Sequence, residues 1–153
     1  MIKTNILSIF DNRLAYIYIW YSKHKQCVYV GQTCGSQGVL GRACSHTSQN
    51  GTLRLRFYEY YGDKLESSSD WKLFTFSLPD KNKYTTTESA FRLGVEYLVQ
   101  VKLHEIRGYA SPPFRIISNV QYVDQCNLRE IKNEAIAIVD KLSNIFGVIR
   151  PDE

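Results

Sequence analysis

Two short segments rich in tyrosine and β-branched residues lie near the start of the chain, with a polar break between them. The first covers residues 15–21 and the second residues 26–31, and both compositions favour strands. The break, residues 22–25, has the length of a hairpin connection. We therefore predict two paired antiparallel strands, which place Tyr18 and Tyr29 on neighbouring strands.

Two helices are predicted after the hairpin. The first runs from about Val39 to Asn50-Gly51, because Asn and Gly accept the left-handed conformation that often ends a helix. Residues 53–61 fit either strand alternation or helical spacing, and we favour a helix that Gly62 ends.

A third strand and a long helix follow. Residues 71–78 alternate between apolar and polar side chains and stop at a proline, which predicts a strand. Thr85 and Glu88 have the spacing of a capping box, so we expect a long helix from there to about Arg107, closed by Gly108.

The last part of the chain is predicted to hold a short fourth strand at residues 114–120 and an amphipathic helix at about residues 127–146. Asn127 and Glu130 form a second capping-box pattern, and Gly147 follows the helix. The apolar side of this helix carries Ile131, Ala135, Ile138, Leu142 and Ile145.

The order of these elements predicts an α+β fold, in which helices flank a small antiparallel three-stranded sheet and an extra helix lies at the C-terminus. The chain of 153 residues has no repeat and no linker, so we expect one domain over residues 1–153. No secretory signal and no apolar run of about 18 residues is evident, so we expect a cytoplasmic protein with reduced thiols.

The net charge and the cysteine spacing indicate whether the protein can bind nucleic acid and zinc. A net charge of +4 permits a nucleic-acid partner without requiring one. Cys34, Cys44, His24 and His46 could be imagined as zinc ligands, but the chain lacks a C-x-x-C pair, so we do not expect zinc.

An arginine and a histidine lie four residues apart in the first predicted helix. Arg42 and His46 share one helix face, with Cβ atoms about 5–6 Å apart. Arginine offers a planar fork to phosphate oxygens, histidine can carry a proton near neutral pH, and a phenol can order or deprotonate a water. Together with Tyr18 and Tyr29, these groups can act on a phosphodiester.

In its motifs the chain resembles the GIY-YIG nuclease family over roughly residues 14–120. The residues that carry the likeness are Tyr16-Ile17-Tyr18, Tyr29-Val30-Gly31 with the following Gln32-Thr33, Arg42, His46, Tyr60-Tyr61-Gly62, Glu96 and Asn119. The chain departs from the family where Tyr16 replaces the first glycine, which affects how closely substrate can approach. The resemblance implies catalytic roles for Tyr18, Tyr29, Arg42, His46 and Asn119.

The resemblance also implies a metal ion, and two glutamates compete for it. Glu88 has a structural role as the capping partner of Thr85, whereas Glu96 lies on an otherwise apolar helix strip and should be paired or bound to a cation. We therefore favour Glu96 as the metal ligand. One carboxylate with waters suits Mg²⁺, and Mn²⁺ is the alternative ion.

The implied activity is metal-dependent hydrolysis of double-stranded DNA by a stand-alone restriction-type or mobile-element endonuclease. A water ordered by Tyr29 and deprotonated through Tyr18 or His46 attacks the phosphorus, and Arg42 neutralises the growing charge. A homodimer could use the apolar face of residues 127–146, although that face could equally pack on the protein's own sheet. The alternatives are a non-catalytic nucleic-acid-binding module with a decayed site and a protein-interaction domain.

Overall fold

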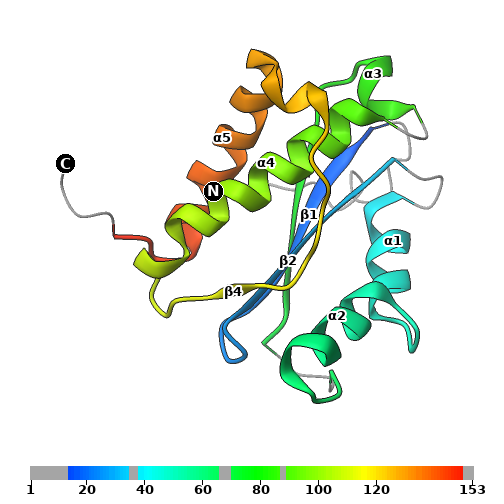
Figure 1. Cartoon of the computed structure of the whole chain (residues 1–153). Coiled ribbons are helices and arrows are strands. Elements are labelled where there is room, and N and C mark those ends of the chain that lie inside the picture. Colours follow the sequence, from blue (N-terminus) through cyan, green and yellow to red (C-terminus); the bar gives the residue numbers. More distant parts are fainter. Residues whose placement is uncertain (1–13, 35–37, 66–69, 87–88, 150–153) are drawn as a thin grey trace.

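The computed structural model describes residues 14–34, 38–65, 70–86 and 89–149, which form one four-stranded sheet with helices on both faces (Figure 1). The strands lie in the order β3-β1-β2-β4. Their bounds are β1 Tyr16–Ser22, β2 Cys27–Thr33, β3 Lys72–Ser77 and β4 Arg115–Ile116.

The sheet is mixed rather than purely antiparallel. β1 pairs antiparallel with β2, as predicted for the hairpin, and also with β3. β4 adds a short parallel pairing to β2, with Cys27 opposite Arg115 and Val28 opposite Ile116. The α+β class is confirmed. The predicted antiparallel three-stranded sheet matches only roughly, because β4, within the short strand predicted at residues 114–120, joins the same sheet as a parallel edge.

Five α-helices lie in the described part of the chain. They are α1 Gly38–Thr47, α2 Thr52–Tyr61, α3 Asn82–Thr85, α4 Ala90–Ile106 and α5 Arg129–Ile145. Two 3-10 turns, Arg107–Tyr109 and Asp124–Asn127, flank the segment that holds β4.

The alternation of side chains along the strands gives the sheet two different faces. α4 and α5 cover one face, and α1 and α2 lie on the other (Figure 1). The strand side chains that pack with α4 and α5 are Ile17, Ile19, Tyr21, Val28, Val30, Phe76 and Ile116. The opposite face carries Tyr16, Tyr18, Cys27 and Tyr29, together with Val39 of α1 and Leu53 and Phe57 of α2. Both predicted catalytic tyrosines therefore lie under α1 and α2.

The predicted capping box at Thr85 is wrong. Thr85 ends the short helix α3, and Ser89 caps α4 instead, because its Oγ accepts from the Arg92 backbone N–H at 3.1 Å. Glu88, the other half of the predicted box, lies outside the described residues. The long helix therefore begins at Ala90, about one turn later than predicted.

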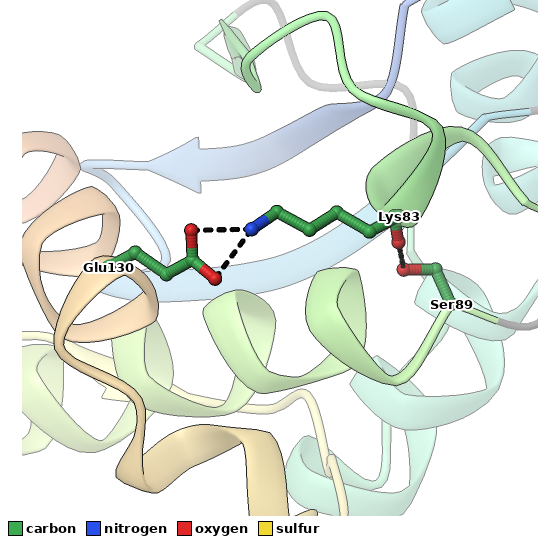
Figure 2. A network of polar contacts seen from close by, with 3 residues as sticks. All are labelled: Lys83, Ser89 and Glu130. Carbon is green, nitrogen blue, oxygen red and sulfur yellow. Dashed lines mark hydrogen bonds and ion pairs between the residues drawn. The ribbon is translucent and has the colours of Figure 1, made fainter.

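The second predicted capping box is also wrong, because tertiary contacts take both of its side chains. Asn127 ends a 3-10 turn and donates from Nδ2 to the Tyr122 hydroxyl at 2.7 Å. Glu130 accepts from the Lys83 ammonium at 2.5 Å (Figure 2). The Lys83 carbonyl in turn accepts from the Ser89 hydroxyl, so one residue of α3 ties the start of α4 to the start of α5.

The two glycines beside α2 act differently. Gly62 has φ +66° and ends α2 in the left-handed region, as predicted. Gly51 has φ −72°, so the predicted left-handed end of α1 is wrong. A Cβ on Gly51 would lie 2.1 Å from the His46 carbonyl oxygen. Glycine is needed there because the chain folds back closely against α1 before α2 begins.

The apolar face of α5 packs inside the protein. Ile131, Ala135, Ile138 and Leu142 are buried in one cluster with α4, whereas Ile145 is exposed. This face is therefore not available for the homodimer contact considered from the sequence.

In the part of the chain that the structure describes, no helix has the length and apolar character needed to cross a membrane.

Candidate active site

The strand register brings the two tyrosines to the same face of the sheet. Tyr18 of β1 lies opposite Gly31 of β2, and Tyr29 lies opposite Trp20. Both rings are buried, with 1% of Tyr18 and 6% of Tyr29 exposed. The hairpin thus holds two phenols side by side beneath α1.

Gly31 makes room for Tyr18. A Cβ built on Gly31 would lie 2.3 Å from Cζ of the Tyr18 ring and 2.4 Å from its hydroxyl oxygen. No side chain fits in that space, so the Tyr18 ring lies directly across the backbone of β2. The absent side chain is what allows the Tyr18 hydroxyl to reach beyond its own strand.

His46 joins the two phenols. It lies in the last turn of α1 and is 4% exposed. Its Nε2 is 2.5 Å from the Tyr18 hydroxyl, and its Nδ1 is 3.4 Å from the Tyr29 hydroxyl. A neutral imidazole has one N–H donor and one acceptor nitrogen, so one phenol donates to the ring and the other accepts from it. The three groups form a continuous path for a proton.

All three groups are held neutral near pH 7. Burial, with a contribution from Arg42, lowers the pKa of His46 to about 4. Burial, followed by the charge of Glu96, raises the pKa of Tyr29 to about 12. Burial also raises the pKa of Tyr18, to which the charges of Tyr29 and Glu96 add. Neutral His46 therefore has an acceptor nitrogen available for proton transfer.

This burial of His46 predicts a pH-dependent stability. The unfolded chain takes up a proton on His46 near pH 6.5, whereas the folded protein does so only near pH 4. The contribution of neutral His46 to the free energy of unfolding is fully present above pH 6.5. This contribution decreases as the pH falls, by about 2 kcal/mol between pH 7 and pH 4.5. Urea unfolding should show that the free energy of unfolding decreases less over this pH range in His46→Gln than in wild type. His24→Gln, in the exposed hairpin turn, serves as the control and should behave like wild type. An equal decrease in His46→Gln and wild type would contradict the lowered pKa of His46.

Arg42 and Glu96 bring opposite charges to the same two phenols. Arg42 is exposed on α1, one turn before His46, and its charge opposes the rise in the pKa of Tyr18 and Tyr29. Glu96 of α4 is 8% exposed, and burial raises its pKa to about 8 against the opposing charges of Arg92 and Arg42. His46 thus contacts both phenols, and the charges of Arg42 and Glu96 act on them from α1 and α4.

The chemistry of Glu96 fits a hard cation. A buried carboxylate whose ionisation is disfavoured gains from a nearby positive charge. Mg²⁺ prefers oxygen ligands and keeps several waters, so one carboxylate and substrate phosphate oxygens can hold it. No group of three or more His, Cys, Asp or Glu residues suited to a metal occurs within the ranges that the structure describes. An ion bound here would take Glu96 as its protein ligand and the other ligands from water and phosphate.

Arg92 is a part of this region that the sequence reasoning missed. It lies one turn before Glu96 on α4 and is 3% exposed. Its guanidinium donates to the Gln32 side chain on β2 and to the carbonyls of Tyr84 and Thr86. These bonds fix α4 against β2 beside Glu96. The i, i+4 spacing of Arg92 and Glu96 on one apolar strip was the signal that could have revealed the residue.

One other predicted residue, Asn119, makes no contact with these groups in the described residues. Asn119 is exposed beyond β4, and its catalytic role stays a prediction. Its neighbour Ser118 makes the contact with β2, because the Ser118 Oγ accepts from the Val30 N–H at 3.1 Å and donates to Gln100 at 2.7 Å. Glu88, the alternative metal ligand, lies outside the described residues.

Comparisons with protein-family models, curated proteins and solved structures found no match for this chain. The resemblance to the GIY-YIG family therefore rests on the sequence motifs alone.

Proposed function

We propose that this protein is a Mg²⁺-dependent endonuclease with a GIY-YIG-like fold that hydrolyses phosphodiester bonds in double-stranded DNA. The observation that carries the proposal is the contact of His46 with both Tyr18 and Tyr29. His46 is buried between two phenols that can exchange protons with it, and the charges of Arg42 and Glu96 act on the same phenols. Paired proton carriers with an exposed arginine suit phosphoryl chemistry.

In the proposed reaction, Arg42 holds non-bridging oxygens of the scissile phosphate and offsets the charge that grows there. Tyr29 orients a water for attack on the phosphorus. Tyr18 accepts a proton from the water while passing its own proton to Nε2 of His46. The bond between phosphorus and the 3′ oxygen breaks, and that oxygen takes a proton from solvent.

Burial and the charge of Arg42 keep His46 weakly basic in the free protein. A bound phosphodiester offsets the Arg42 charge, so substrate binding itself makes His46 a better proton acceptor. When bound at Glu96, Mg²⁺ would supply positive charge to the leaving oxygen. Mn²⁺ satisfies the same requirements.

The test is incubation of supercoiled plasmid with Mg²⁺ and either wild type or an Arg42→Ala, Glu96→Ala double variant. We expect the wild type to convert the plasmid to nicked and linear forms, and the double variant to leave it supercoiled. The two truncated side chains supply the charge stabilisation, so the expected loss is at least about a thousandfold in rate. A wild type that neither cuts nor retards DNA would contradict the proposal.

One observation favours a second candidate, a nucleic-acid-binding module with a decayed site. Tyr16 is 3% exposed and lies in the same cluster as Tyr18 and Tyr29, at the position where the family has glycine. A large ring there fills space beside the proposed site. In the plasmid experiment, retardation of DNA without cutting by the wild type would identify this second function.

A further inference from the structure

Helix α2 carries two arginines with different surroundings. Arg54 is built into the fold, because its Nε donates to the Thr47 carbonyl at 2.6 Å and its Nη1 to the Leu65 carbonyl at 2.7 Å. Arg56 instead forms an ion pair with Glu59 on its own helix at 2.7 Å. The side chains of this pair are 35% and 55% exposed, and exposed ion pairs contribute little to stability. The Arg56 guanidinium can therefore exchange its partner at low cost.

Arg56 lies beside the face of α2 that packs against the tyrosine cluster. Leu53 and Phe57 form the buried stripe of α2 and share a cluster with Tyr18 and Tyr29. At about 100° per residue, Arg56 lies on one flank of that stripe and Arg54 on the other. The flank that holds Arg56 is thus at the boundary between the tyrosine cluster and solvent.

The charge of Arg56 acts on one of the tyrosines. Burial and Glu96 raise the pKa of Tyr29 to about 12, while the charges of Arg42 and Arg56 oppose the rise. Arg42 comes from α1 and Arg56 from α2, the two helices on the tyrosine side of the sheet (Figure 1). Two solvent-accessible guanidinium groups on separate helices therefore act on one phenol.

We propose that Arg56 is a second phosphate-binding residue of this site, which holds a backbone phosphate next to the one that Arg42 holds. This inference rests on the proposed nuclease function. DNA presents regularly spaced phosphates, and a guanidinium binds phosphate oxygens through paired hydrogen bonds. In the free protein the Glu59 carboxylate occupies the place of the phosphate, so DNA must displace it.

The test is binding of a fluorescent DNA duplex, followed by anisotropy in EDTA over a range of salt concentrations. Arg56→Gln should bind about tenfold more weakly, because it loses a charged hydrogen bond. The slope of log affinity against log salt should become shallower by about one unit. Glu59→Gln should bind more tightly than wild type, because Arg56 no longer has a competing carboxylate. With Mg²⁺ present, the Arg56→Gln defect should appear in KM more than in kcat.

The matched control is Arg129→Gln, at the exposed start of α5 on the other side of the sheet. It removes the same charge and should bind and cut DNA like wild type. The opposite effects expected for Arg56→Gln and Glu59→Gln separate DNA binding from any common effect on the folding of α2.

The outcomes distinguish this inference from the function on which it rests. If wild type cuts DNA but Arg56→Gln binds with wild-type affinity and salt slope, Arg56 is not a phosphate ligand and the nuclease proposal stands. The same holds if Arg56→Gln and Arg129→Gln weaken binding equally. If wild type neither binds nor cuts DNA, both proposals are wrong.

Discussion

Replacing Glu96 by glutamine is expected to reduce DNA cleavage by about a thousandfold or more while the protein still binds DNA. Glutamine keeps the size and shape of the side chain but removes the charge that would hold Mg²⁺, and with it the stabilisation of the leaving oxygen. The initial rate of plasmid nicking measures the first effect, and anisotropy in EDTA measures the second.

The same substitution should stabilise the metal-free protein. Glu96 is 8% exposed and burial raises its pKa to about 8, so its charged form is costly in the folded state. Because the pKa is raised in the folded state, protonated Glu96 contributes most to the free energy of unfolding below pH 4.5. That contribution is lost as the pH rises through 8. Urea unfolding in EDTA at pH 8.5 should therefore show Glu96→Gln to be more stable than wild type. A gain in stability together with a loss of activity is typical of a functional residue rather than a packing residue.

Two control variants test whether the loss of DNA cleavage is specific to Glu96. Glu105→Gln changes an exposed glutamate on the same helix and should cut DNA like wild type. Glu88→Gln changes the alternative ligand and should retain cleavage. Cleavage that survives Glu96→Gln but not Glu88→Gln would contradict the metal assignment.

Replacing Gly31 by alanine is expected to damage both stability and activity. The added Cβ would lie 2.3 Å from the Tyr18 ring, so either the ring or the strand must move. Overpacking of this kind costs about 2 kcal/mol in the free energy of unfolding. Any shift of Tyr18 also lengthens its 2.5 Å contact with His46, and a misplacement of about 1 Å can reduce a catalysed rate by about a hundredfold. Urea unfolding and plasmid nicking measure the two effects.

A double-mutant cycle shows whether the Tyr18 ring is the cause. Gly31→Ala should cost much less stability in a Tyr18→Ala background, because the ring that it meets is gone. Gly108→Ala is the matched control, since a Cβ there meets nothing within 4 Å and should change neither property. If Gly31→Ala costs the same in both backgrounds, the close approach of Tyr18 to Gly31 is not what requires glycine.

The hairpin, α2 with its glycine end, and β3 could be predicted from sequence because local patterns specify them. The start of α4 could not. Several hydroxyl residues precede that helix, and local propensity does not choose between Thr85 and Ser89. The choice depends on tertiary contacts, in which the Ser89 hydroxyl bonds to the Lys83 carbonyl and Arg92 bonds to the Tyr84 carbonyl. β4 lies within the short strand predicted at residues 114–120, but its parallel pairing with β2 could not be predicted, because pairing between distant segments leaves no local pattern.

The sequence predicted some features of the candidate site, and others became evident only in the folded chain. Tyr18, Tyr29, Arg42 and His46 were identified from residue type and spacing, and Glu96 from the family resemblance. The fold places His46 in contact with both tyrosines, and the charges of Arg42 and Glu96 act on the same phenols. The sequence could not show that Tyr18 lies across Gly31, because that depends on the register between β1 and β2. It could not show the burial of Arg92 either, because its acceptors on β2 and in the residues before α4 come close only in the folded chain.

The central claim is that these five residues form one metal-dependent site, and a crystal soaked in Mn²⁺ tests it most directly. Anomalous diffraction locates Mn²⁺ without ambiguity from water. We predict a peak at the Glu96 carboxylate, on the side of Tyr18 and Tyr29, that is missing in crystals of Glu96→Gln. Mn²⁺ bound at Glu88 or elsewhere, with none at Glu96, would contradict the account.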